Sequence, residues 1–213
     1  MSTAALRDEV LALLEACGDG IAPIVAAGSP VLRTAAHPYD GQLADDELAA
    51  LVALMRRTMH AAPGVGLAAP QVGLPLALAV VEDPGVGAAD VARERERPAL
   101  PFRVLVNPSY EAVDDERVGF YEGCLSVPGY AAVVARLRRV RLTGQDETGA
   151  ELDEVVTGWP ARIVQHETDH LHGTLYLDRA ELRSLALADG AAARWAAEPH
   201  PHAAAEALGF TLP

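Results

Sequence analysis

Residues 160–173 have the sequence PARIVQHETDHLHG, which predicts a helix around which the rest of the fold is expected to pack. Proline favours the first turn of a helix, and glycine favours the position just after the last turn. Pro160 and Gly173 therefore predict a helix over residues 161–172. Because residues i and i+4 share a helical face, roughly 5–6 Å apart at Cβ, His166 and His170 are expected to point the same way.

Two histidines spaced as in HExxH are typical of a divalent metal site. Two neutral imidazoles bind one ion, and the acidic residue after the first histidine lies beside the ion's open coordination position. Glu167 occupies that place, where it is a candidate proton acceptor for a water molecule. The alternative is a chance match on an exposed helix.

Two histidines leave such a site incomplete, because a catalytic site usually has three protein ligands. In the protease pattern HExxHxxGxxH the third ligand is a histidine, but Tyr176 stands at that position here. His172 follows His170 by only two residues and would face another side of the helix. Cys124, in the segment EGCLS at residues 122–126, is the candidate third ligand; the alternative is a small buried hydrophobic residue.

A glycine-rich segment, GVGLAAPQVG, spans residues 64–73. It precedes its strand, lacks the lysine and hydroxyl residue of a phosphate-binding loop, and does not show the spacing of a dinucleotide-binding motif. We interpret it as a loop whose backbone pairs with an extended peptide, with Gln71 directed toward a polar centre.

The other elements follow from hydrophobic periodicity. Helices are predicted over residues 3–17 and 45–61. Strands are predicted over residues 74–81, 102–106, 133–142 and 152–156. Residues 84–101, with mixed charges and several prolines and glycines, are expected to form a solvated loop.

These elements indicate an α+β protein: antiparallel sheets packed around a central helix that carries HExxH, with an N-terminal helix and an alanine-rich C-terminal tail. We expect a catalytic domain over residues 1–180, including the N-terminal helix, and a C-terminal extension over residues 181–213. The formal net charge of −13 disfavours nucleic-acid binding, DNA included. No segment has the apolar length to cross a bilayer, and the start lacks a signal peptide's pattern, so we expect a cytoplasmic protein with no membrane partner.

The three singled-out segments together resemble the signature motifs of the peptide deformylase family. The patterns GxGxAAxQ, EGCxS and QHExDHxxG occur in the family's order, and the likeness spans residues 22–180. The resemblance implies metal-dependent removal of the N-formyl group from the N-terminal methionine of newly synthesised polypeptides, with release of formate. It also implies Cys124, His166 and His170 as metal ligands. The family's metal is typically Fe(II), which zinc, nickel or cobalt can replace, and the ligand set does not choose among them.

The resemblance implies further roles around the metal. Glu167 would be the general base and acid, while Gln71 and the backbone N–H of Leu125 would stabilise the oxyanion. Val65 and Gly66 match positions whose backbone pairs with the bound peptide.

Helical spacing adds candidates for the substrate pocket. Ile163 and Trp159 share a helical face with His166 and would form walls for the methionine side chain; the alternative is ordinary core packing. Asp169 is a candidate partner of Arg136, and this pair would brace the metal-binding helix.

Two other functions remain open on the sequence. One is a metalloprotease or other amidase that uses the same HExxH. The other is a deformylase-like fold that binds without catalysis. Ala131 leaves room for this interpretation, because many relatives carry an arginine at that position. The absence of the arginine puts catalytic efficiency and substrate preference in doubt.

Ribosome contact is possible, but we do not expect it through the tail. Residues 181–213 hold two arginines against four acidic residues, a net charge of −2, and Pro199 and Pro201 interrupt any continuous helix. The best basic alternative is the set Arg136, Arg138, Arg139 and Arg141, which strand alternation would divide between two faces.

Overall fold

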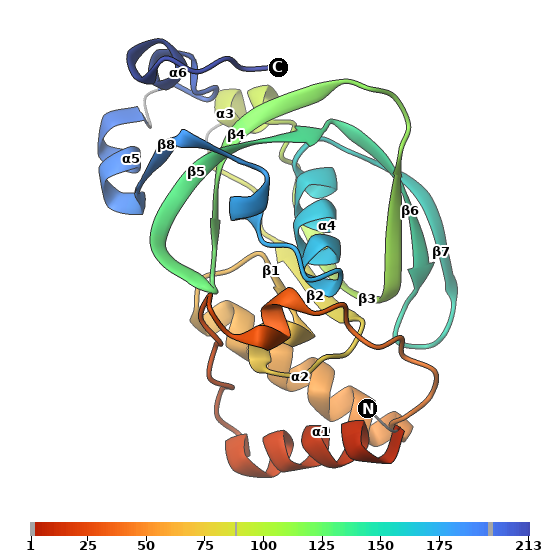
Figure 1. Cartoon of the computed structure of the whole chain (residues 1–213). Coiled ribbons are helices and arrows are strands. Elements are labelled where there is room, and N and C mark those ends of the chain that lie inside the picture. Colours follow the sequence, from red (N-terminus) through yellow and green to blue (C-terminus); the bar gives the residue numbers. More distant parts are fainter. Residues whose placement is uncertain (1–2, 88, 196–197) are drawn as a thin grey trace.

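The chain forms two antiparallel sheets with a helix between them (Figure 1). The computed structural model describes residues 3–87, 89–195 and 198–213. The larger sheet has the strand order β1-β2-β3-β6-β7 and the smaller sheet the order β4-β5-β8, and every pairing between described strands is antiparallel. The strands are β1 (Gly66–Ala68), β2 (Leu78–Asp83), β3 (Leu100–Ala112), β4 (Arg117–Cys124), β5 (Val127–Leu137), β6 (Arg139–Gln145), β7 (Glu151–Thr157) and β8 (Ala180–Leu187).

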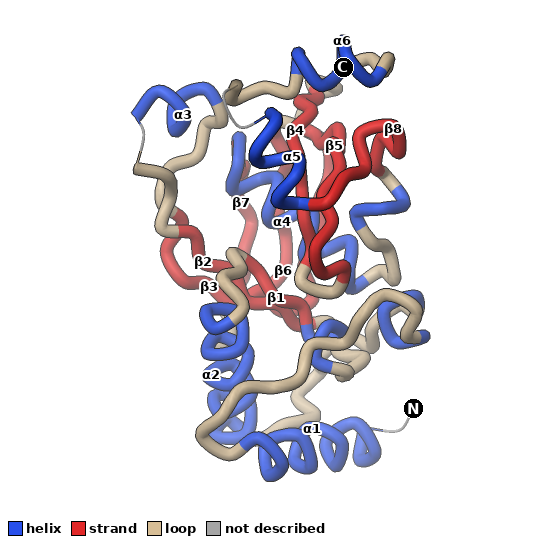
Figure 2. The backbone as a smooth tube through the Cα atoms, turned by 90° about the vertical axis from the view of Figure 1, so that its left-hand side faces the viewer, coloured by secondary structure: helices blue, strands red, loops and turns tan. Residues whose placement is uncertain are grey.

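The helices surround and fill this framework. Helix α4 (Gly158–Leu171) carries HExxH and contacts strands of both sheets. Helices α1 (Thr3–Cys17) and α2 (Asp45–Ala61) pack against each other, and α2 also contacts β1 and β2 (Figure 2). The short helices are α3 (Ala89–Glu94), α5 (Ala188–Trp195) and α6 (His202–Leu208), and the 3-10 turns are η1 (Pro30–Arg33), η2 (Ala69–Val72) and η3 (Tyr176–Asp178).

Helix α2 forms because charge, capping and burial agree along its sequence. Its first turn holds Asp45, Asp46 and Glu47, and these negative charges stabilise the helix because they lie at the positive end of its dipole. The Glu47 carboxylate accepts a hydrogen bond from the backbone N–H of Ala44 at 2.9 Å and also pairs with Arg7 of α1. The leucines and methionines of its buried face join the core cluster that also includes Leu67 of β1 and Leu78 and Val80 of β2.

The structure confirms the predicted mixture of helices and antiparallel sheets, including the two helices over residues 3–17 and 45–61. One strand prediction is wrong: residues 133–142 are not one strand, because β5 ends at Leu137 and β6 begins at Arg139 in the other sheet. The alternation of valine and arginine continues across this junction, so periodicity cannot locate the change of partner. Only the second half of the predicted strand 74–81 is β-strand, and Leu76 instead forms an isolated parallel bridge with His37.

The prediction of a solvated loop over residues 84–101 is only partly confirmed: the described residues between 84 and 99 are exposed or half-buried, but they do not all form a loop. This segment includes α3, and its later residues are tied into the body of the protein. Arg97 forms an ion pair with Asp83, which is buried, and the backbone carbonyl of Glu96 accepts a hydrogen bond from the backbone N–H of Trp159. The charged residues of this segment therefore form ion pairs with the body of the protein while remaining at its surface.

The expected boundary between residues 180 and 181 falls within β8. This strand pairs with β5, so residues 181–187 belong to the smaller sheet and not to a separate extension. The chain then continues through α5 and α6 (Figure 1). In the part of the chain that the structure describes, no helix combines the length and the apolar character required to span a membrane.

Candidate metal and catalytic site

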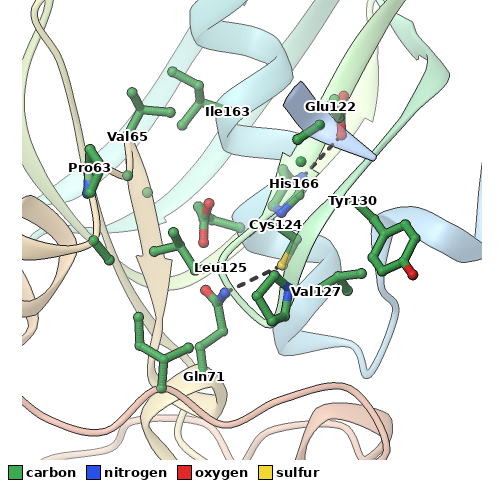
Figure 3. Close-up of a pocket in the computed structure, with 18 of the residues that line it drawn as sticks. Pro63, Val65, Gln71, Glu122, Cys124, Leu125, Val127, Tyr130, Ile163 and His166 are labelled. Atoms are coloured by element: carbon green, nitrogen blue, oxygen red, sulfur yellow. Dashed lines mark hydrogen bonds and ion pairs between the residues drawn. The ribbon is translucent and has the colours of Figure 1, made fainter. Parts of the chain in front are cut away.

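Three segments that are distant in the sequence meet beside α4. Cys124 ends β4, Gln71 lies in η2, and His166 comes from the helix (Figure 3). His170 lies one turn further along the same helix. The ligand atoms of Cys124, His166 and His170 all lie within 4.8 Å of one another, and the Cys124 Sγ is 3.3 Å from His170 Nε2. The sequence-predicted ligand set is therefore brought together by the fold.

Local geometry explains how each of these side chains reaches the site. One helical turn separates His166 from His170, and their ring centroids are 5.0 Å apart. The pairing of β4 with β5 shifts register between Gly123 and Cys124, where the strand ends in a turn and the cysteine points toward the helix (Figure 3). Tyr176, which replaces the protease histidine, lies in η3 with its ring 6.2 Å from that of His166.

The donor set suits a divalent transition metal. A cysteine thiolate and two imidazoles are common ligands of such ions, and three protein ligands leave a position open, as catalytic sites require. Donor atoms bonded tetrahedrally to one ion at about 2.0–2.3 Å lie roughly 3.3–3.7 Å apart, so separations of up to 4.8 Å require side-chain movements of about 1 Å. Nδ1 of His166 faces Glu122, which leaves Nε2 for an ion.

The buried carboxylate of Glu122 contacts His166 on the Nδ1 side of its ring. Oε2 of Glu122 lies 3.1 Å from His166 Nδ1, and the same carboxylate accepts hydrogen bonds from Arg136 at 2.7 and 2.9 Å and from Arg162. Burial alone would raise the pKa of Glu122, but Arg136, His166 and Arg162 hold this pKa well below its ordinary value. The charged form of Glu122 is thus the one that orients the imidazole.

The predicted partnership between Arg136 and Asp169 is confirmed. Nη1 of Arg136 donates to Asp169 Oδ2 at 2.7 Å, so this guanidinium links Glu122 on β4 with helix α4. Asp169 also accepts hydrogen bonds from Tyr110 and Arg179. Burial, followed by the charge of Asp169, raises the pKa of Tyr110 to about 12, which keeps its hydroxyl protonated as a donor.

Glu167 lies in the wall of the same cavity and is almost fully buried. Burial raises its pKa to about 7, although the charges of His166 and Arg136 favour the ionised form. Among the described residues, no donor or acceptor pairs with its Oε2. A Cβ atom at Gly66 would lie 2.2 Å from Glu167 Oε1, so only glycine at that position leaves room for this carboxylate.

Gln71 is fixed with its amide nitrogen toward the cysteine. Its Oε1 accepts a hydrogen bond from the backbone N–H of Ala68 at 2.9 Å, which determines the orientation of the amide. Its Nε2 then donates toward Cys124 Sγ at 3.5 Å (Figure 3). It also donates toward Ser126 Oγ at 3.3 Å. The direction predicted for Gln71, toward a polar centre, is therefore confirmed.

Cys124, His166, Glu167 and Gln71 line one cavity of about 560 Å³. The sequence-predicted residues Val65, Gly66, Leu125, Trp159 and Ile163 all line it. Glu122, Arg162, Tyr121 and Ala188 line it too, and sequence reasoning did not assign them a role. Glu122 had a signal, its place in EGCLS, whereas Ala188 reaches the cavity only because α5 folds back beside β5.

The arginines considered for ribosome contact are largely neutralised by acidic partners. Arg136 is buried, as described above. The exposed members are paired: Arg138 with Glu96 and Glu116, Arg139 with Asp114, and Arg141 with Asp153.

Comparisons with known proteins agree with this site. The family profile described as polypeptide deformylase matches residues 21–185. Peptide deformylase 3 of Streptomyces avermitilis is 62% identical over 208 residues, which cover 98% of this chain and 92% of that protein. Peptide deformylase 1 of Streptomyces coelicolor is 62% identical over 194 residues, which cover 91% of this chain and 88% of that protein.

Solved structures give the same result. A Met-Ala-Ser-bound class I type b peptide deformylase from Acinetobacter baumannii matches with a TM-score of 0.67 and 34% identity, covering 75% of this chain and 98% of that one. The enzyme from Thermotoga maritima matches with a TM-score of 0.62 and 33% identity, covering 76% of this chain and 98% of that one. The chain therefore belongs to the peptide deformylase family, whose members remove the N-formyl group from nascent peptides.

Proposed function

We propose that Cys124, His166 and His170 bind a divalent ion and that Glu167 and Gln71 carry out deformylation beside it. The observation that supports this most strongly is the convergence of the three ligand atoms within 4.8 Å. Glu167 lines the same cavity, and the amide nitrogen of Gln71 lies 3.5 Å from the cysteine sulfur. This grouping of a candidate metal site, a carboxylic acid and an amide donor supports the hydrolysis of an amide bound among them.

Each residue has a defined task in this proposal. A bound divalent ion would lower the pKa of a water molecule and polarise the formyl oxygen. Glu167 takes a proton from the water as its oxygen bonds to the formyl carbon, and returns the proton to the methionine nitrogen as the C–N bond breaks. Gln71 Nε2 and the backbone N–H of Leu125 donate to the negative charge that develops on the formyl oxygen, a contribution of roughly 2.7–4 kcal/mol per donor. Formate and a free amino terminus are the products.

The substrate would bind as an extended peptide with its methionine side chain in the cavity. Strand β1 lies at the edge of the larger sheet, so one side of it is open to pairing with a peptide at Val65 and Gly66. Ile163 forms an apolar wall for the side chain. The bound Met-Ala-Ser of the Acinetobacter enzyme has the sequence expected of such a product.

We further propose Fe(II) as the native metal, with zinc, nickel or cobalt able to replace it, and formyl-methionyl nascent peptides as the substrates in the cytoplasm. The thiolate and imidazole ligands accept any of these ions. Iron is the choice that the family resemblance favours.

The test is formate release from formyl-Met-Ala-Ser by protein purified without oxygen, combined with metal analysis. Glu167→Ala is expected to retain the ion, because Glu167 is not a ligand in this proposal, and to lose turnover by about 10²–10⁴-fold, the usual contribution of general acid–base catalysis. Glu151→Ala, at an exposed position of β7, serves as the matched control. Near wild-type turnover by Glu167→Ala would show that the assigned proton transfer is wrong.

A further inference from the structure

The C-terminal segment after residue 197 folds back onto β4. The imidazole of His200 stacks on the ring of Phe120, with centroids 4.8 Å apart and ring planes at 28°. Nearby, a Cβ atom at Gly119 would lie 2.9 Å from Leu212 Cδ2, so the end of the chain rests directly on the bare backbone of this strand (Figure 1). The segment therefore has a defined seat beside Phe120.

Phe120 connects this segment with the catalytic cavity. Its ring centroid lies 5.5 Å from that of Trp159, and Trp159 lines the cavity. The guanidinium of Arg95 lies beside both rings, 5.7 Å from Phe120 and 5.5 Å from Trp159, and donates a hydrogen bond to the carbonyl of Pro199 at 3.2 Å. A continuous series of contacts thus runs from the C-terminal segment to a wall of the cavity.

The orientation of the Trp159 ring depends on this packing. Nε1 of Trp159 is buried, and no hydrogen-bond acceptor for it exists among the described residues, although a buried indole N–H usually has one. The guanidinium of Arg97 lies over the ring, 4.8 Å from its centroid. Its ion pair with Asp83 of β2 holds Arg97 in this position. Phe120 and Arg95 supply the neighbouring contacts. Since the indole has no polar anchor among the described residues, its position depends on packing: on the buried apolar cluster that includes Ile163 and Val164, on Arg162, and on the aromatic and cationic groups named above.

We infer that residues 198–213 act as a strap that holds Trp159, through Phe120 and Arg95, and thereby sets the size of the methionine pocket. His200, Phe120 and Arg95 are positioning residues in this arrangement, because they do not reach the substrate. The strap makes the cavity selective for the slender methionine side chain over bulkier first residues such as phenylalanine. This inference rests on the proposed function of the cavity, since it concerns the substrate that the cavity accepts.

The experiment compares substrate selectivity with the environment of Trp159. The chain has two tryptophans, so Trp195→Phe leaves Trp159 as the only indole reporter. In that background, His200→Ala removes the stacked ring, His200→Phe restores a ring, and Glu206→Ala changes an exposed residue of the same segment. For each variant, kcat and KM are measured on formyl-Met-Ala-Ser and formyl-Phe-Ala-Ser, together with acrylamide quenching of the indole fluorescence.

His200→Ala is expected to lower the ratio of kcat/KM for the methionine over the phenylalanine peptide by about 2- to 12-fold, the equivalent of one lost aromatic pair. The change should fall mainly on KM for the phenylalanine peptide, and quenching should increase. His200→Phe is expected to restore both readouts, and Glu206→Ala to leave both unchanged. Unchanged selectivity and quenching in His200→Ala would overturn the inference.

The two readouts separate this inference from the proposed function. Quenching needs no turnover, so it reports on the strap even in protein that does not release formate. Failure of the unsubstituted enzyme to deformylate formyl-Met-Ala-Ser would contradict the proposed function alone. Normal deformylation with equal quenching and selectivity in all variants would contradict the strap alone.

Discussion

Replacing Glu122 with glutamine is expected to destabilise the protein and weaken its affinity for metal. Glu122 is only 7% exposed, and its carboxylate faces Arg136, Arg162 and His166 at once. Glutamine preserves the shape but removes the negative charge. The two buried guanidinium groups then lose the partner that offsets their desolvation, apart from the contact of Arg136 with Asp169.

The magnitude follows from the burial of these groups. Breaking a buried ion pair by removing one partner costs about 3–5 kcal/mol. In a protein of this size each kcal/mol lowers the Tm by about 2–4 °C, so the Tm of the metal-free protein should fall by roughly 6–20 °C. Since Glu122 also orients His166, zinc affinity should decrease by about 10- to 100-fold.

The assay is thermal unfolding of metal-free protein followed by circular dichroism, with zinc titration against a chromophoric chelator. Asp153→Asn is the matched control, because Asp153 also accepts two hydrogen bonds from one arginine, Arg141, but at an exposed site. Exposed ion pairs contribute little to stability, so this variant should resemble the wild type. If Glu122→Gln unfolds at the same temperature as Asp153→Asn and binds zinc equally tightly, the reasoning is refuted.

Four further outcomes are expected. Cys124→Ala should sharply lower the metal content of the purified protein in elemental analysis, and full occupancy would mean that another residue is the third ligand. Gly66→Ala would place a Cβ atom 2.2 Å from Glu167 Oε1, so kcat should fall by about 10²–10⁴-fold with the metal retained; a wild-type kcat would contradict this. In air, the iron form should lose activity faster than the nickel form as Fe(II) and Cys124 oxidise, and equal half-lives would count against it. Ribosome co-sedimentation should not depend on the tail, whose net charge over residues 181–213 is −2; salt-sensitive binding that disappears with the tail would disprove this.

Features that depend on neighbouring residues could be predicted from the sequence. The spacing of His166 and His170 places both on one helical face whatever surrounds the helix, because 3.6 residues make one turn. Helices α1 and α2 follow from leucines at the same period, and the structure gives them the predicted limits. The chemistry of the site could be predicted for the same reason, because it depends on residue types and on short spacings in the sequence.

Features that depend on long-range pairing required the tertiary structure. The alternation of residues 133–142 suits a strand, but it does not say that Arg138 is where the chain leaves one sheet for the other. Charged residues after Pro84 suggest solvent until Asp83 and Trp159 are seen beside them. Strand partners lie far apart in sequence, and hydrophobic period gives no information about which partner a strand takes.

The same division applies to the site itself. The sequence names Cys124 as a candidate ligand, but only folding brings its sulfur to 3.3 Å from His170. The support of His166 by Glu122 and Arg136, and the contact of His200 with Phe120, join segments that no local pattern relates. Local sequence therefore determines which groups are available for chemistry. Their positions relative to one another come from packing between elements, and burial strengthens the interactions between them.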